Sequence, residues 1–544
     1  MSRPWGAHQS GGSSSRVLGR LAAIALLASP LPIPQAAAQS RPSREASGAL
    51  SRIDYAYRGW ATAGRRWLAK YSGVAWDSHA GKWVRALPND AANQDVAQQV
   101  YFAEYALRPA LALAVSQRDV KLLDELAQFY LAFRPRFVQV RQLQSWPGNH
   151  DLLAEQGSED AFVLPWLERT EKGRRVRECQ LCTGQFLHPA ARLLHYIAEV
   201  PASRRSPNMN AFARAYERIL VDDYVLRLAY DAAVERYGFR ADTRGLIALW
   251  SAIASSVDST RPSYRRAMLD SDLWVLATTA EILAAAKSDS TVIDLGSRRV
   301  RLMRIVAAGT RLLATKRHLH SAPTNSTDTL ASVSYFDGDF SDHPDMAYAG
   351  WDDSLPPRLG DSARAESASW DISHSYRIPV TLRSLSDAQD ATHLSYPDSL
   401  ELRRVATQYV RRAHYHLRGF PLFHSFLDGS DGWYRVVRSA TGVAGYPPPR
   451  WCDTRRVGRD CLTAGALFGW GQLRADDRDL AGLADEIMDL ATTHDPVAVE
   501  FRRRYFGFAG QELAFPDTAD RERPTSLLLF DVVAESLRES RKAW

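Results

Sequence analysis

The sequence predicts an all-α protein, and three observations carry that prediction. Apolar residues recur at intervals of three and four along most of the chain, which is the spacing of one buried helix face. Few segments show the strict alternation of apolar and polar residues that is typical of a half-buried strand. Long stretches rich in Gly, Pro and aromatic residues separate some helical segments, at 138–185, 318–371 and 418–461. Connections of this length are usually functional when they occur inside a compact domain.

The first 38 residues have the three parts of a cleavable signal peptide. Arg3, Arg16 and Arg20 supply positive charge, the run 21–33 is mostly Leu, Ala and Ile, and three alanines at 36–38 form a small-residue cleavage site. Prolines at 30, 32 and 34 disfavour an anchor helix, because each would break or kink it. We therefore expect a periplasmic or secreted protein.

The rest of the chain shows no clear domain boundary. Residues 39–48 read as a polar tail, and 49–544 are expected to form a single domain. Within it the periodicity predicts helices near 50–71, 94–115, 118–134, 186–199, 209–235, 244–257, 262–287, 303–314, 373–386, 402–417, 462–473, 478–493 and 525–540. The segment 402–417, for example, carries Leu402, Val405, Ala406, Tyr409, Ala413 and Leu417 on one helical face.

About a dozen helices, with long loops between alternate ones, predict an α/α toroid. In a complete or incomplete (α/α)6 barrel, helical hairpins pack around an axis and the loops at one end build a funnel. The layout resembles the (α/α)6-toroid carbohydrate-active proteins of the polysaccharide lyase and glycoside hydrolase types. The resemblance covers most of the chain after the leader and rests on architecture and aromatic content. It implies a poly- or oligosaccharide as the partner.

Charge and hydropathy exclude two other classes of partner. The chain has 68 basic and 62 acidic residues. Cleavage of the leader would remove three basic residues and no acidic ones. A surplus of three charges is no polyanion-binding signature, so no nucleic acid is expected. After the leader, no segment approaches the run of about 18 apolar residues that a membrane span needs, so no stable membrane insertion is expected.

The four cysteines form two pairs that are close in sequence. Cys179 lies three residues before Cys182, and Cys452 lies nine residues before Cys461. In an exported protein, two local disulfides are the first expectation. A four-cysteine zinc site would require both pairs to meet in space and is not expected.

Asp371, His374 and Arg377 are the first candidates for catalysis. They follow one another at intervals of three residues where a helical pattern begins. Asp371 or Ser373 is suited to cap that helix, which would place Asp371 and His374 on one face within hydrogen-bonding reach. Such a pair would hold one imidazole tautomer and make His374 a general base. Arg377 would then face the same side and bind a substrate carboxylate. The alternative is that Asp371 only caps the helix.

A second cluster lies in the preceding long loop. Asp342, His343 and Asp345 surround a proline, a spacing typical of a tight turn begun by Asp342. The alternatives are an acid or base role for one carboxylate, or calcium binding by both. Tyr348 and Tyr376 are further candidates, Tyr348 as a base and Tyr376 as a residue that contacts substrate.

Two His-x-His pairs occur at 318–320 and 414–416. Residues two apart share a face on a strand but diverge on a helix. The pair at 414–416 lies in the helical pattern of 402–417, so its imidazoles are expected to diverge. Neither a metal site nor a cofactor is expected.

Fifteen tryptophans are many for this length. Indole rings stack on the apolar faces of sugars, so tryptophans in polar, loop-like surroundings are candidates for a glycan platform. Those candidates are Trp351, Trp370, Trp433 and Trp451. A tryptophan in an apolar run, such as Trp274, is expected in the core.

These features favour an exported, glycan-active enzyme. Elimination from a uronic acid needs a base for the C5 proton and a cation, which His374, a tyrosine and Arg377 would supply. Hydrolysis is the alternative and needs two carboxylates that flank the glycosidic bond, drawn from Asp342, Asp345 and Asp371. The alternative that involves no catalysis is a glycan-binding protein or a scaffold protein of the cell envelope.

Overall fold

The computed structural model describes residues 52–85, 96–144, 157–170, 173–236, 239–255, 263–322, 330–339, 349–351, 368–434, 445–452, 461–466, 468–506 and 527–537. The chain divides into two units, Met1–Ala49 and Leu50–Trp544, and all the described residues belong to the second. The expected signal peptide at 1–38 and polar tail at 39–48 therefore lie outside the described residues.

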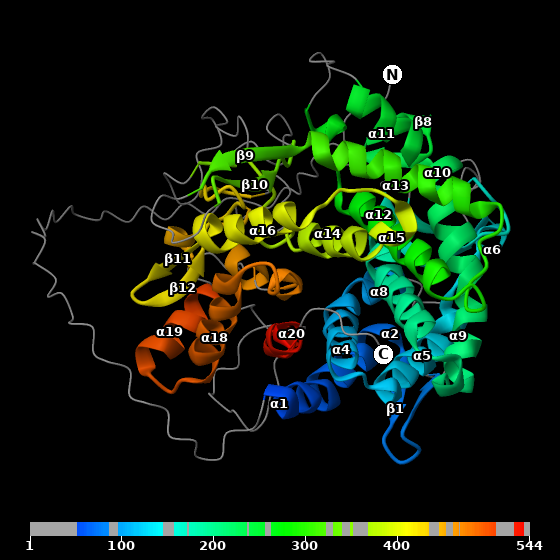
Figure 1. Ribbon diagram of the computed structural model, residues 1–544, viewed down its shortest axis with the longest axis horizontal. Coiled ribbons are helices and arrows are strands. Elements are labelled where there is room, and N and C mark those ends of the chain that lie inside the picture. Colours follow the sequence, from blue (N-terminus) through cyan, green and yellow to red (C-terminus); the bar gives the residue numbers. More distant parts are fainter. Residues whose placement is uncertain are drawn as a thin grey trace, which may run out of the picture. The chain divides into compact units, whose positions relative to one another are not determined.

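The described chain is mostly helical, which confirms the all-α class (Figure 1). The α-helices are α1 Arg52–Gly59, α2 Arg65–Ser72, α3 Val96–Tyr101, α4 Glu104–Gln117, α5 Val120–Phe133, α6 Val140–Gln144, α8 Gln180–Glu199, α9 Pro207–Arg218, α10 Arg227–Tyr230, α11 Leu246–Ser255, α12 Asp270–Ser288, α13 Arg298–Thr315, α14 Arg377–Asp387, α15 Gln389–Thr392, α16 Ser399–Gln408, α18 Arg478–Thr492, α19 Pro496–Tyr505 and α20 Leu527–Ser536. Three π-helical segments continue or join them, at η1 Trp60–Gly64, η4 Ile219–Leu226 and η7 Tyr409–Ala413.

Several of these helices begin at residues with a side-chain cap. Asp119 accepts a hydrogen bond from the Leu122 backbone N–H at 3.0 Å before α5. Ser206 and Asp398 cap α9 and α16 in the same way. Each cap satisfies a backbone donor that the first turn of a helix leaves unpaired. The predicted helix at 118–134 is accordingly confirmed within a residue or two.

The predicted helix at 462–473 is wrong. The segment 462–473 forms two short 3-10 turns, η9 Leu462–Gly465 and η10 Trp470–Leu473. Gly469 between them has a left-handed backbone, with φ of 72°. A left-handed residue interrupts the α-helical ladder, so the apolar spacing alone did not describe this segment.

The strands form two-stranded antiparallel sheets in the described residues. The pairs are β1 Val74–Asp77 with β2 Lys82–Arg85, β3 Val138–Gln139 with β4 Phe162–Val163, β5 Pro165–Thr170 with β6 Gly173–Glu178, β7 Ala233–Arg236 with β8 Phe239–Arg244, β9 Arg317–Ser321 with β10 Ser332–Phe336, and β11 His414–Leu417 with β12 Phe420–Phe423. They are short (Figure 1) and leave the class all-α.

The β11–β12 hairpin corrects the expected helix at 402–417. Helix α16 and the segment η7 end at Ala413, and the chain then reverses through Arg418 and Gly419. Both turn residues have positive φ, 56° and 82°. Two such residues between paired strands are the hairpin turn that matches the strand twist. His414 and His416 therefore lie on a strand and not on a helix.

Helix α12 lies at the centre of the apolar core. Helix α12 packs against α8, α13 and α14. Trp274 on α12 is fully buried there, as its apolar neighbours in the sequence predicted. Buried side chains of α4, α5, η10 and α20 belong to the same core. Helix α14 is thus held by packing, and it begins three residues after His374.

Both predicted disulfides are present. Cys179 pairs with Cys182, and Cys452 pairs with Cys461, with Cα–Cα distances of 5.2 Å and 5.8 Å. Two disulfides are compatible with a secreted protein. In the part of the chain that the structure describes, no helix combines the length and the apolar character of a membrane span.

Candidate functional site

Asp371 and His374 form the predicted hydrogen-bonded pair. The imidazole Nδ1 lies 2.8 Å and 2.9 Å from the two carboxylate oxygens of Asp371. The same carboxylate accepts hydrogen bonds from the backbone N–H groups of Ser373 and His374, each at 3.1 Å. The pair therefore lies in a tight turn just before α14, where an aspartate orders the two residues that follow it.

The pairing fixes the chemistry that His374 can perform. An ionised carboxylate only accepts hydrogen bonds, so Nδ1 carries the proton and donates it to Asp371. The second ring nitrogen, Nε2, then holds a lone pair and can accept a proton. The Asp371 side chain is 3% exposed and the His374 side chain 24% exposed. The carboxylate is thus enclosed, while the imidazole reaches the surface.

Backbone contacts hold this turn against a second loop. The Ile372 N–H donates to the carbonyl of Ser425 at 2.8 Å, and the Leu427 N–H donates to the carbonyl of Trp370 at 2.9 Å. The loop itself is ordered by Asp431, whose carboxylate accepts from the Ser425 N–H at 2.9 Å. The position of His374 is consequently set by two loops that are distant in the sequence.

Tyr434 lies beside the pair, in a segment that backbone hydrogen bonds hold in place. The ring of Tyr434 lies 5.7 Å from that of His374, between centroids, and Tyr434 pairs with Tyr446 through two backbone hydrogen bonds of 3.0 Å and 2.8 Å. The Trp433 N–H donates to the carbonyl of Trp351 at 3.2 Å. Backbone hydrogen bonds thus link the segments at 351, 433–434 and 446, and the ring of Tyr434 lies beside His374.

The tryptophans contribute to this site in a different way from the one expected. Trp433 is fully buried, and Trp351 and Trp370 are each 7% exposed. Rings with so little free surface support the loops by packing and do not form an open platform for sugars. Trp451 is half-buried, with the guanidinium of Arg450 4.8 Å from its ring centroid.

Arg377 and Tyr376 also differ from expectation, because both side chains are fully buried. The Arg377 guanidinium pairs with Asp270 at 3.1 Å and donates to Tyr101 Oη at 2.7 Å and to Gln185 Oε1 at 2.9 Å. Its charge is therefore compensated within the protein, and it joins α14 to α8 and to the start of α12. The Tyr376 hydroxyl donates to the buried carboxylate of Glu104 at 3.2 Å.

Four predicted site residues lie outside the described residues, and nothing is concluded about them. They are Asp342, His343, Asp345 and Tyr348.

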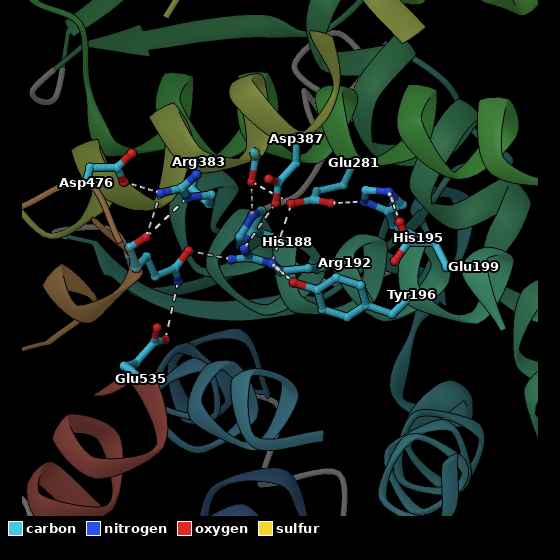
Figure 2. A network of polar contacts seen from close by, with 12 residues as sticks. His188, Arg192, His195, Tyr196, Glu199, Glu281, Arg383, Asp387, Asp476 and Glu535 are labelled. Carbon is cyan, nitrogen blue, oxygen red and sulfur yellow. Dashed lines mark hydrogen bonds and ion pairs between the residues drawn. The ribbon is translucent and has the colours of Figure 1, made fainter. Parts of the chain in front are cut away.

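A polar network that the sequence reading missed lies in the core and involves the second half of α14. Figure 2 shows it between α8, α12 and α14, with contributions from the segment after η10 and from α20. Glu281 on α12 accepts from His195 Nδ1 at 2.6 Å and from Ser384 Oγ at 2.7 Å. Arg192 donates to Gln472 Oε1 at 2.7 Å and lies 3.6 Å from the Glu281 carboxylate.

Burial and charge shift the pKa values in this network. Burial lowers the pKa of His188 to about 3, so its imidazole is neutral. Burial alone would raise the pKa of Glu281. The hydrogen bond from His195 and the charge of Arg192 outweigh it and hold that pKa well below its usual range. The network thus contains a fixed carboxylate that neutralises a buried arginine.

The network resembles a nucleophile–base arrangement only superficially. Ser384 Oγ and His188 Nε2 are 3.1 Å apart. Ser384 has one proton and donates it to Glu281, so His188 Nε2–H must donate to Ser384 and cannot act as its base. Ser384, His188 and Glu281 are also fully buried. We interpret the network as a structural one that fixes the register of three helices.

The sequence carried a signal for this network. On α8, polar residues follow one another at intervals of four and three, on one face of a helix that is otherwise apolar: His188, Arg192, His195 and Glu199. Polar residues at that spacing within a buried helix require partners on neighbouring helices.

Comparison of the chain with protein-family models, with curated proteins and with solved structures finds no match. The chemistry of the site therefore has to be argued from its own geometry.

Proposed function

We propose that the chain is an exported enzyme that cleaves a polysaccharide or oligosaccharide, with His374 as the general base. The observation that carries this proposal is the Asp371–His374 pair, in which a buried carboxylate orients an imidazole that reaches the surface. A positioned base of this kind contributes about 10²- to 10⁴-fold to a proton-transfer step. We further propose that the helices are arranged as an α/α toroid.

Elimination from a uronate fits this base better than hydrolysis does. His374 Nε2 would take the proton from C5, the C4–oxygen bond would break, and the electron pair would leave with the oxygen, which takes up a proton. Hydrolysis would need Asp371 as one of two carboxylates beside the glycosidic bond. Asp371 is instead enclosed, and its Oδ1 accepts hydrogen bonds from three donors of its own turn.

Arg377 is not assigned to the substrate in this proposal. Its guanidinium is fully buried and pairs with Asp270, so that buried contact would have to be broken before a substrate carboxylate could replace Asp270. The charge of a uronate would therefore be met by another group. In the mechanism suggested by the sequence, Arg377 contacts the substrate. In the mechanism proposed here it does not.

The test is activity of the purified mature protein on a panel of neutral and uronate-containing glycans. Elimination creates a C4–C5 double bond that absorbs in the ultraviolet, whereas hydrolysis creates new reducing ends without that absorbance. We expect His374→Ala and Asp371→Asn to lower the rate of elimination by about 10²-fold or more. Asp371→Asn acts through the tautomer, because an amide can donate to Nδ1 and move the ring proton to Nε2.

His79→Ala is the matched control, since His79 is exposed in the β1–β2 turn. It should leave the rate unchanged, and all three variants should bind a cleaved substrate as the native protein does. Full activity of His374→Ala would refute the assignment. Binding of a glycan without any cleavage would identify a binding protein instead.

A further inference from the structure

The β11–β12 hairpin brings two imidazoles together. His414 and His416 lie two residues apart on β11, and their ring centroids are 4.9 Å apart. Side chains two apart on a strand point to the same side. The helix expected for this segment would have separated them.

A carboxylate from another element completes the group. Glu486 on α18 lies with Oε2 2.8 Å from His416 Nε2. One ligand atom from each of His414, His416 and Glu486 can be chosen so that all three lie within 4.8 Å of one another. Around a tetrahedral zinc ion, ligand atoms at about 2.0 to 2.2 Å from the metal are about 3.3 Å apart. Small side-chain rotations would bring the three atoms to that spacing.

In the group formed by His414, His416 and Glu486, the Nε2 atom of His414 lacks a hydrogen-bond partner among the described residues. Nδ1 lies 3.2 Å from the carbonyl of Val410 and therefore donates to it, which leaves the lone pair on Nε2. Nε2 is buried and has no hydrogen-bond partner among the described residues. A buried acceptor without a partner is costly. A backbone carbonyl that fixes the tautomer in this way is the usual outer support of a metal-binding histidine.

We propose that His414, His416 and Glu486 bind one divalent transition-metal ion of the zinc class. Two imidazoles and one carboxylate favour zinc and its neighbours over calcium or magnesium, which prefer oxygen ligands. The side chains of His416 and Glu486 are 49% and 37% exposed, so an ion can enter from the surface and keep a water as its fourth ligand.

The ion would join the hairpin to α18. The strand β12 leads at once to His424 and Ser425, and the Ser425 carbonyl accepts the hydrogen bond from Ile372 described above. The metal site would therefore stiffen the support of the loop beside His374 without taking part in the proposed proton transfer. It is independent of the proposed function.

The experiment uses the full mature protein, produced without a polyhistidine tag and stripped with a chelator. Zinc binding is measured by calorimetry, and cobalt binding by the visible absorbance of a tetrahedral site. We expect one ion per chain, and we expect His416→Ala and Glu486→Gln each to weaken binding by about 100-fold or more. Loss of a residue that only supports a ligand weakens metal binding by about 10- to 100-fold, so loss of a direct ligand should cost at least the upper value.

His318→Ala is the matched control, because His318 and His320 form the other His-x-His pair on a strand, β9. It should bind zinc as the native protein does. The proposal is overturned if no ion binds, if either Glu486→Gln or His416→Ala binds unchanged, or if His318→Ala weakens binding equally. In the first case His416 and Glu486 form only a surface ion pair.

Discussion

Replacement of Glu281 by glutamine tests whether the buried network stabilises the fold. Glutamine keeps the volume and one carbonyl oxygen, but it removes the charge that Arg192 and His195 face in the core. Removing one partner of a buried ion pair typically costs about 3 to 5 kcal/mol, because the remaining charge is left uncompensated.

The structure places the expected value near the lower end of that range. Arg192 keeps a hydrogen bond to Gln472 and lies 3.8 Å from the carboxylate of Asp387, so its charge remains partly compensated. The carbonyl oxygen that glutamine keeps can still accept the hydrogen bond from His195 Nδ1. We therefore expect Glu281→Gln to lower the free energy of unfolding by about 3 kcal/mol.

Urea unfolding followed by circular dichroism measures the change, provided that the dependence on denaturant is the same in both proteins. Glu500→Gln is the matched control, since Glu500 is 61% exposed in its ion pair with Arg503. An exposed pair of this kind contributes about 0 to 1 kcal/mol. If Glu281→Gln shifts the unfolding midpoint no more than Glu500→Gln does, the network does not stabilise the fold and its interpretation fails.

Two further predictions concern α20 and the loop beside His374. Arg108 pairs with Glu104, Asp531 and Glu535 in the core, and burial together with the two other carboxylates raises the pKa of Asp531 to about 8. The unfolded carboxyl titrates near pH 4, so the folded state holds a proton that the unfolded state has lost, and stability should fall as pH rises from about 4 to about 8. Asp531→Asn should flatten that slope in unfolding experiments across this range, and equal slopes would show that Asp531 is ionised when folded. In the loop, a Cβ on Gly432 would lie 2.1 Å from the backbone N of Gly350. Gly432→Ala should therefore destabilise the protein by about 1 to 3 kcal/mol in thermal unfolding, whereas Gly482→Ala, with open space around it, should not destabilise it.

Features that depend on local spacing were predictable from the sequence. The helix at 118–134 and the disulfide from Cys452 to Cys461 both follow from residues that are near each other in the chain. The hydrogen bond between Asp371 and His374 belongs to the same kind, because three residues of separation bring the two side chains together in a turn as well as in a helix. Its local geometry did not depend on the exact start of α14.

Features that depend on distant partners were not predictable. Arg377 looked available because its spacing placed it on the face of Asp371 and His374. Its donors are instead used by Asp270, Tyr101 and Gln185, which come from three other segments. Trp433 is buried for a similar reason, since the contact with the backbone of Trp351 brings two polar loops together over it. Composition around a residue does not reveal which remote segment will cover it.

A signal in the local sequence could have corrected the prediction for 402–417. The apolar residues up to Ala413 do belong to a helical segment, and only the last four positions form a strand. The dipeptide Arg418–Gly419 separates two short runs rich in aromatic residues, which is the length of a tight hairpin loop. Giving that signal priority over periodicity would have placed His414 and His416 on one face.

Helix α14 connects the candidate site to the core. Arg377, at its first turn, is fixed by Asp270 and Gln185, and Ser384, two turns later, is fixed by Glu281 and His188. A helix held at two points by buried polar contacts has little freedom to shift along its neighbours. The turn that carries His374 leads directly into this helix, so the core helps to set the direction of the imidazole, which is partly exposed. Rigid support of a partly exposed base is what a proton-transfer site requires.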